Sequence, residues 1–259
     1  MKLASSYLNG ESPRARGEKK LRRCLDWLYR WGYSSGPVLT TVSQAKQAIA
    51  GKMVKAGLVV ATRTEAGGVT RGTPAFYYTL TQSGLEEAER MTEQLVRYPE
   101  ADDRYRVNQG QLRHYLLAQS ATAIAINAGA IIKYQTERQI DGEGDKVGIK
   151  RPDVVWTYPS GKQMAVEVEL SAKWERKLDD FVLAIYRCLE PGETGSSRFE
   201  RVTVITDSPA IKTRYEEAVQ PNKPIQIWEK NKRGHYAVTE TILAPEWLVE
   251  RVDFSVIES

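Results

Sequence analysis

The most regular alternation of apolar and polar positions in the chain lies at 164–170, which reads Met-Ala-Val-Glu-Val-Glu-Leu. Successive side chains of a β-strand point to opposite faces, so Glu167 and Glu169 are expected on one face and the valines on the other. A Pro-Ser-Gly turn separates this strand from an apolar one at 154–158. The pattern therefore predicts a hairpin that brings Asp153, just before its first strand, close to both glutamates.

A helical period follows the hairpin. Apolar residues recur at steps of three or four over 174–189, and no proline interrupts them, so we expect one helix with a single buried stripe, formed by Trp174, Leu178, Phe181, Ile185 and Leu189. The remaining pattern in this half predicts a helix at 111–127, strands at 130–138, 202–205 and 225–229, and a short helix at 211–219.

The first half shows the same two periods in a different order. Apolar positions at helical spacing predict helices at 18–31 and 43–56, the second opening on a Ser43 cap and ending at Gly57. Strands are expected at 58–64 and 75–81, joined by a glycine-rich basic loop, with another helix beginning near Ser83.

The length of 259 residues, and a proline- and glycine-containing segment that breaks the helical patterns, predict two domains. Residues 97–110 are polar, contain Pro99 and Gly110, and interrupt two helical patterns, so they are interpreted as a linker. The prediction is a flexible basic arm at 1–17, one domain at 18–96 and a second at 111–259.

Charge is unevenly distributed between these parts. Residues 1–90 hold fourteen Lys and Arg against seven Asp and Glu, a net +7, whereas the whole chain carries +4, which leaves −3 for the rest. The positive first part is suited to bind the phosphates of a nucleic acid. The mildly negative second part is expected if its carboxylates bind a metal cation.

The acidic cluster is the main candidate for chemistry. Oxygen ligands from Asp153, Glu167 and Glu169 suit Mg²⁺ or Mn²⁺, which can polarise a phosphodiester and activate an attacking water. Carboxylates so close together repel one another, so the cluster needs a cation or a lysine, and Lys173 is the nearest in sequence. Acids beside Lys and Arg are also common on solvated sheet faces, which leaves a plain surface strand as the alternative.

Other chemistries find less support in the sequence. His114 and His235 have no Cys or His neighbours at metal-binding spacing, and no phosphate-binding loop or nucleophile elbow is present. Cys24 and Cys188 fall on predicted buried faces in different domains, which argues against a disulfide framework or zinc site. No apolar run approaches the length needed to cross a bilayer, and the start lacks the apolar core of a signal peptide, so the expected location is cytoplasmic.

The second half of the chain resembles the PD-(D/E)XK restriction-endonuclease-like fold. The resemblance rests on the order of its elements, helix, three strands, helix, strand, and on the motifs Pro-Asp and Glu-Val-Glu. The resemblance implies that Asp153 and Glu167 bind the metal ion, with a further ligand from the preceding strand, for which Glu137 is our choice. The alternative is an ion pair of Glu137 with Arg138 or Lys133 at the end of the strand. The usual third residue is Lys, whereas this chain has Glu169, so either Glu169 takes the role of base or Lys173 supplies the positive charge.

The order of elements in the first domain resembles a winged helix-turn-helix. That resemblance implies double-stranded DNA as partner, with the helix before the hairpin in the major groove and the loop as the wing. The DNA-contacting residues would then be Gln44, Lys46, Gln47, Lys52 and Lys55 on the helix and Arg63 and Arg71 on the wing. Winged helices can also bind protein, and a basic helix face is often merely solvated.

As a whole the sequence predicts an α/β chain of the α+β type, with an N-terminal winged helix and a C-terminal nuclease-like mixed sheet flanked by helices. It is similar to the replication-relaxation proteins of mobile elements and to MobC-type plasmid mobilisation relaxases, a similarity that includes Lys177 and Tyr186 on the helix after the hairpin. This implies a magnesium-dependent DNA endonuclease that nicks one strand, with other relaxosome proteins as further partners. The alternatives are a non-catalytic DNA-binding regulator of replication or mobilisation with an inactive nuclease-like domain, and a homodimeric double-strand endonuclease.

Overall fold

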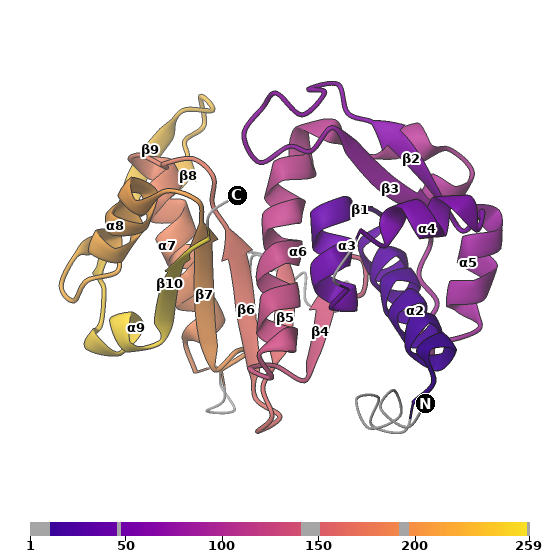
Figure 1. Cartoon of the computed structure of the whole chain (residues 1–259). Coiled ribbons are helices and arrows are strands. Elements are labelled where there is room, and N and C mark those ends of the chain that lie inside the picture. Colours follow the sequence, from indigo (N-terminus) through magenta and orange to yellow (C-terminus); the bar gives the residue numbers. More distant parts are fainter. Residues whose placement is uncertain (1–10, 46–47, 141–150, 192–196, 258–259) are drawn as a thin grey trace. The chain divides into compact units, whose positions relative to one another are not determined.

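The computed structural model divides the chain into two compact units, the first ending at Asn127 and the second beginning at Ala128 (Figure 1). It describes residues 11–45, 48–140, 151–191 and 197–257. Helices and strands both contribute to each unit, so the chain is a mixed α/β protein of the α+β class, as the sequence predicted.

The first unit is built from helices around a small antiparallel sheet. Its helices are α2 (Pro13–Trp31), α3 (Gly36–Ser43), α4 (Ala50–Lys55), α5 (Gln82–Glu89) and α6 (Leu112–Asn127). Its strands are β1 (Ser34–Ser35), β2 (Val59–Arg63) and β3 (Phe76–Leu80), hydrogen-bonded in the order β1-β3-β2. Three short 3-10 turns, Pro99–Ala101, Arg104–Arg106 and Gln109–Gln111, lie between α5 and α6.

Helix α2 begins earlier than the sequence indicated. The Ser12 hydroxyl accepts a hydrogen bond from the Ala15 amide at 3.1 Å, and Pro13 occupies the first turn, where its missing N–H costs nothing. Arg14 and Arg16 are therefore helical residues and do not belong to a flexible arm. The helix ends at Gly32, whose φ of 85° favours glycine and whose N–H donates to the Leu28 carbonyl.

Of the helix predicted at 43–56, Ala50–Lys55 is present as α4, whereas α3 ends at Ser43, where the predicted helix would begin. Gln44 caps α3 in the left-handed conformation, with φ of 52°, so the chain turns away after Ser43. The Ser43 hydroxyl donates back to the Thr40 carbonyl at 3.1 Å and does not cap a new helix. The sequence pattern missed this turn because non-glycine residues rarely adopt it.

Helix α6 belongs to the first unit, although the sequence assigned it to the second domain beyond a linker at 97–110. Gln119, fully buried, explains this position. Its carbonyl accepts from Trp27 Nε1 at 3.0 Å and from Ser34 Oγ at 2.7 Å, and its amide donates to the Tyr33 carbonyl at 2.9 Å. These three bonds tie α6 to α2 and to the segment around β1.

The second unit is a five-stranded mixed sheet in the order β10-β7-β6-β5-β4. Strands β4 (Lys133–Thr136), β5 (Val154–Thr157) and β6 (Gln163–Val168) form an antiparallel meander, and β7 (Arg201–Thr206) and β10 (Val252–Val256) add in parallel. Helix α7 (Arg176–Leu189) connects β6 to β7. Phe181, Ile185 and Leu189 of the predicted stripe are buried in the same core as Val155, Ala165 and Val204 of the sheet. Trp174, predicted as the first residue of that buried stripe, lies before the helix and is exposed, because the helix begins only at Arg176.

The rest of this unit comprises α8 (Pro209–Ala218), a two-stranded hairpin of β8 (Pro224–Lys230) and β9 (Tyr236–Leu243), and α9 (Glu246–Glu250). The sequence predicted β8 but neither β9, α9 nor β10. Strand β9 is exposed along almost its whole length, so it carries no alternation to detect.

None of the helices in the described ranges is both long and apolar enough to cross a lipid bilayer.

Both cysteines are buried free thiols, and burial raises the pKa of Cys24 to about 12.

Candidate active site and nucleic-acid interface

The register of β5 and β6 determines how the predicted acidic residues lie. Val154 pairs with Val166 and Val155 with Ala165. One step beyond this ladder, Asp153 lies opposite Glu167, and directly opposed residues of antiparallel strands point to the same face. The Asp153 carboxylate also accepts a hydrogen bond from the Val168 amide at 2.7 Å, which holds it against the backbone between the two glutamates. The sheet thus brings the three acids to one end of the hairpin, as predicted.

Both glutamates are buried. Glu167 is 4% and Glu169 6% exposed, far below what is usual for carboxylates. Glu167 shares its face with Ala165 and Val204, which pack under α7. Glu169 extends the ladder past the end of β6, where its amide donates to the Ile205 carbonyl of β7 at 2.8 Å. Burial of this kind needs compensation by hydrogen bonds or positive charge, so a plain solvated strand face does not describe these residues.

Glu169 receives such compensation from two sides. Lys173 forms an ion pair with its Oε1, and the Tyr215 hydroxyl donates to its Oε2 at 3.4 Å and to the Ser171 carbonyl at 3.2 Å. The Lys173 ammonium also lies 4.8 Å from the centre of the Phe181 ring. Burial, followed by the negative charge of Glu169, raises the pKa of Tyr215 well above its ordinary value. Tyr215 therefore stays protonated and acts as a hydrogen-bond donor at neutral pH.

Glu137 lies at the same end of the sheet. It directly follows β4, whose Thr136 pairs with Val154, but it begins a turn in which Gln139 and Ile140 both donate to the Thr136 carbonyl. The turn explains why the predicted strand at 130–138 stops early. Glu137 therefore lies one residue beyond the last pair between β4 and β5, opposite Asp153, but it does not itself belong to the strand.

Two further residues of α7 were expected near the site. Tyr186 stacks on Trp247 and donates to Glu190 at 2.7 Å, near the end of the helix away from Lys173. Lys177 is exposed.

The structure adds side chains that the sequence did not identify. Asp207 is buried directly after β7, beside the end of β6, and its position after an apolar strand was a usable signal. Tyr215 gave no such signal, since its hydroxyl reaches Glu169 only through the packing of α8.

Carboxylate oxygens are the ligands that hard divalent cations such as Mg²⁺ prefer. Within the described residues no group of three or more His, Cys, Asp or Glu side chains has the geometry of a metal site. The residues that could hold such an ion are Asp153 and Glu167, which lie opposite each other across β5 and β6. Mg²⁺ is commonly held by one or two carboxylates, with water and substrate phosphate completing the octahedron, so two such ligands suffice.

In the first unit, only some of the residues predicted to contact DNA share one element. Lys52 and Lys55 are exposed on α4, Arg63 ends β2 exposed, and Arg71 is exposed in the loop between β2 and β3. Lys46 and Gln47 lie outside the described residues. Gln44 caps α3 and does not belong to the helix of Lys52, and its amide donates to the Asn127 side chain at 2.9 Å.

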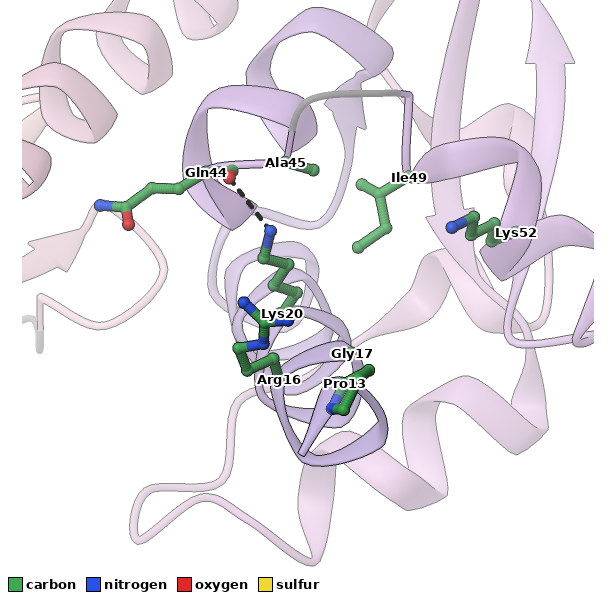
Figure 2. Close-up of a pocket in the computed structure, with 8 residues that line it drawn as sticks. All are labelled: Pro13, Arg16, Gly17, Lys20, Gln44, Ala45, Ile49 and Lys52. Atoms are coloured by element: carbon green, nitrogen blue, oxygen red, sulfur yellow. Dashed lines mark hydrogen bonds between the residues drawn. The ribbon is translucent and has the colours of Figure 1, made fainter. Parts of the chain in front are cut away.

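Basic side chains gather instead around a hollow of about 450 Å³ beside α2 (Figure 2). Arg16 and Lys20 border it from α2 and Lys52 from α4, and its described lining contains no acidic residue. Figure 2 shows the Lys20 ammonium directed at the Gln44 carbonyl, a bond of 3.2 Å, while the Gln44 side chain points away. Lys20 was not expected here, because the sequence pattern of this segment indicated only a helix packed on its apolar face.

Comparison with known proteins adds little to this description. No family model and no curated protein matches the chain. Among solved structures the chain is similar to protein VC1899 from Vibrio cholerae, with 13% identity and a TM-score of 0.26. The match covers 80% of this chain and 51% of VC1899, so the chain spans about half the length of that protein. A TM-score this low carries no argument about fold or function.

Proposed function

We propose that this protein is a metal-dependent DNA endonuclease that nicks one strand, in the manner of a mobile-element relaxase. The first unit would select the site and the second would cut. The observation that carries the proposal is the cross-strand position of Asp153 and Glu167, with the Asp153 carboxylate held on the Val168 amide and a buried Glu169–Lys173 pair beside it.

The order of strands supports the same assignment. An antiparallel meander followed by a crossover helix and a parallel strand is the arrangement expected of a PD-(D/E)XK core, with Asp153 before the second strand and Glu167 on the third. In the first unit, helices followed by a sheet in the order β1-β3-β2 support a winged helix.

The residues divide the work of cleavage as follows. Asp153 and Glu167 would hold Mg²⁺, or Mn²⁺, which polarises the phosphodiester and favours ionisation of a bound water. Glu169 would accept the proton of the attacking water on its carboxylate. Tyr215 would orient that carboxylate through Oε2, and Lys173 would balance its charge and help stabilise the charge developing on the phosphate.

DNA binding would rest on the basic residues of the first unit. Lys52 and Lys55 of α4, Arg63 and the wing residue Arg71 supply phosphate contacts, and the hollow bordered by Lys20 extends this surface.

A second candidate has an observation in its favour. Both oxygens of Glu169 already have partners, Lys173 and Tyr215, as they would in a site that no longer performs chemistry. In that case the protein is a DNA-binding regulator of replication or mobilisation, and the nuclease-like unit serves for partner binding or dimerisation.

Substitution of one acid separates the two candidates. For a nuclease, Asp153→Asn abolishes cleavage of supercoiled plasmid and leaves DNA binding within about twofold of wild type, since each lost charge-stabilising group costs orders of magnitude in rate. Asp253→Asn is the matched control, because Asp253 belongs to the same sheet but pairs with Arg201. Loss of DNA binding in Asp153→Asn, with binding retained in the control, would contradict this division of labour.

A further inference from the structure

The segment that follows Lys173 presents an exposed aromatic ring. Trp174 is 64% exposed, whereas aromatic residues of this size are usually buried. It lies between β6 and α7, one residue after the lysine that pairs with Glu169. An exposed tryptophan at that position, beside the carboxylates of the candidate active site, requires an explanation other than packing.

An arginine covers one face of this ring. The Arg214 guanidinium carbon lies 3.4 Å from the centre of the Trp174 ring, which is stacking distance. Arg214 is itself fixed, because its Nε donates to the Lys173 carbonyl at 2.6 Å. With one face under the guanidinium and most of the side chain exposed, the opposite face of the indole is accessible to a planar ligand.

A second pair of the same kind follows two residues later. The Arg176 guanidinium lies 3.9 Å from the centre of the Tyr236 ring, and the Lys230 ammonium lies 5.4 Å from it. Tyr236 is also exposed. Two aromatic rings, each backed by an arginine, therefore flank the start of α7.

The backbone between the two pairs is constrained. Glu175 has φ of 45° and ψ of −130°, a conformation rarely adopted by residues with a side chain. Strain of this kind is retained where the surrounding structure requires a particular geometry, and it concentrates at functional segments. Glu175 lies between Trp174, the last loop residue before this position, and Arg176, the first residue of α7, so it sets the relative directions of the two side chains.

We infer that Trp174, backed by Arg214, is a stacking platform for an unpaired nucleobase of the DNA strand held beside Lys173. Aromatic rings bind single strands through base stacking, and nearby cations attract the phosphates. A paired base already stacks on its neighbours and cannot occupy the platform, so the favoured substrate is single-stranded or locally unwound DNA. The inference rests on the proposed function for the identity of the strand, but it concerns binding and not cleavage.

The test compares two single strands in the presence of chelator, so that no cleavage occurs. The probes are a fluorescein-labelled oligothymidylate and an oligomer of equal length with abasic sugars, read by fluorescence anisotropy. Wild type is expected to bind the thymidylate more tightly. Trp174→Ala should bind it roughly fivefold to a hundredfold more weakly and lose the preference, whereas Trp174→Phe should keep most of both.

Tyr105→Ala serves as the matched control. Tyr105 is 65% exposed and has the Arg104 guanidinium 5.0 Å from its ring centre, but it belongs to the first unit. Its substitution should leave the preference for bases unchanged. Two outcomes would contradict the proposed stacking role of Trp174. In one, the wild-type protein binds the thymidylate and the abasic oligomer equally; in the other, Trp174→Ala keeps the wild-type preference for thymidylate.

This outcome is independent of the nuclease proposal. If plasmid cleavage is absent in every metal while Trp174→Ala still loses its preference, the platform holds and the catalytic assignment fails. If cleavage depends on Asp153 while Trp174→Ala binds as wild type, the platform fails and the nuclease stands.

Discussion

Lys173 determines how much negative charge the acidic cluster carries. Its ion pair with Glu169 neutralises one of the three carboxylates at this end of the hairpin, which Asp153 and Glu167 share. The lysine is only partly exposed and Glu169 is buried, so their attraction is less screened by water than that of a surface pair.

Lys173→Met should therefore reduce both activity and stability. Removing the lysine leaves the buried Glu169 carboxylate without its ion pair, and we expect a loss of about 1–3 kcal/mol in unfolding free energy. Denaturant unfolding measures the loss, and plasmid cleavage should fall in parallel. Lys177→Met, four residues later and exposed, should change neither by a measurable amount.

The raised pKa of Tyr215 determines how the unfolding free energy should change at alkaline pH. Its pKa in the folded protein is raised above the ordinary value of 10, so the folded state holds this proton more tightly than the unfolded chain does. The resulting stabilisation is complete below pH 10 and is lost as pH rises through the folded-state pKa. Tyr215→Phe lacks this contribution, and it also loses about 1 kcal/mol from the missing hydrogen bonds.

Urea unfolding of both proteins from pH 8 upward, in unit steps, measures this effect. The difference in unfolding free energy between wild type and Tyr215→Phe should be constant below about pH 10 and shrink above it. A difference that grows with alkaline pH would contradict the assigned direction of the shift.

Among the elements, those with a regular hydrophobic period were predicted and those set by turns or exposure were not. Phe181, Ile185 and Leu189 of the predicted stripe are buried on α7, whereas Trp174 lies before the helix and is exposed. The alternation at 164–170 correctly predicted strand β6, which is buried on both faces from Met164 to Val168. The single helix expected at 43–56 was wrong because the left-handed Gln44 is a tertiary feature with no glycine to signal it. Asp153, Glu167 and Glu169 could be brought together from strand register alone, whereas Tyr215 and Asp207 depend on how other elements pack.

Helix α5 contains Gly84, which packs so closely against the backbone of Leu58 that there is no room for a side chain. A Cβ on Gly84 would lie 1.9 Å from the Leu58 carbonyl oxygen, which is backbone and cannot move aside cheaply. Gly84→Ala should destabilise the protein by about 3 kcal/mol. Gly51→Ala in α4 is the opposite case, because its Cβ would meet no described atom within 4 Å. That change should stabilise by up to about 1 kcal/mol, and thermal unfolding of the two variants should move in opposite directions.

Helix α2 provides a matched pair of lysines for testing the nucleic-acid interface. Lys20 borders the basic hollow, whereas Lys19 pairs with Glu11 at 2.9 Å. Lys20→Ala should weaken duplex binding similarly for all sequences and lower the slope of log affinity against log salt by about 1. Lys19→Ala should leave the slope unchanged. Equal effects of both substitutions would show that the hollow is not a specific phosphate contact.

At the scale of the whole molecule, charge follows the division into units. Residues 91–127 contain four basic and four acidic residues, so the first unit keeps the net +7 of residues 1–90 and the second carries −3. The sequence predicted this asymmetry but put the boundary near the linker at 97–110. The buried Gln119 of α6 accounts for the difference, because a polar residue within a helical pattern gave no indication of which unit it would bond to.

The most direct test of metal-dependent nicking is incubation of the protein with supercoiled plasmids, one carrying DNA from around its own gene, with magnesium, with manganese and with chelator. The expected result is conversion to open circle that requires metal and disappears in Asp153→Asn. Linear product under the same conditions would indicate a dimeric double-strand endonuclease. Tight binding without cleavage in any metal, unchanged in Asp153→Asn, would contradict the nuclease and favour the non-catalytic regulator.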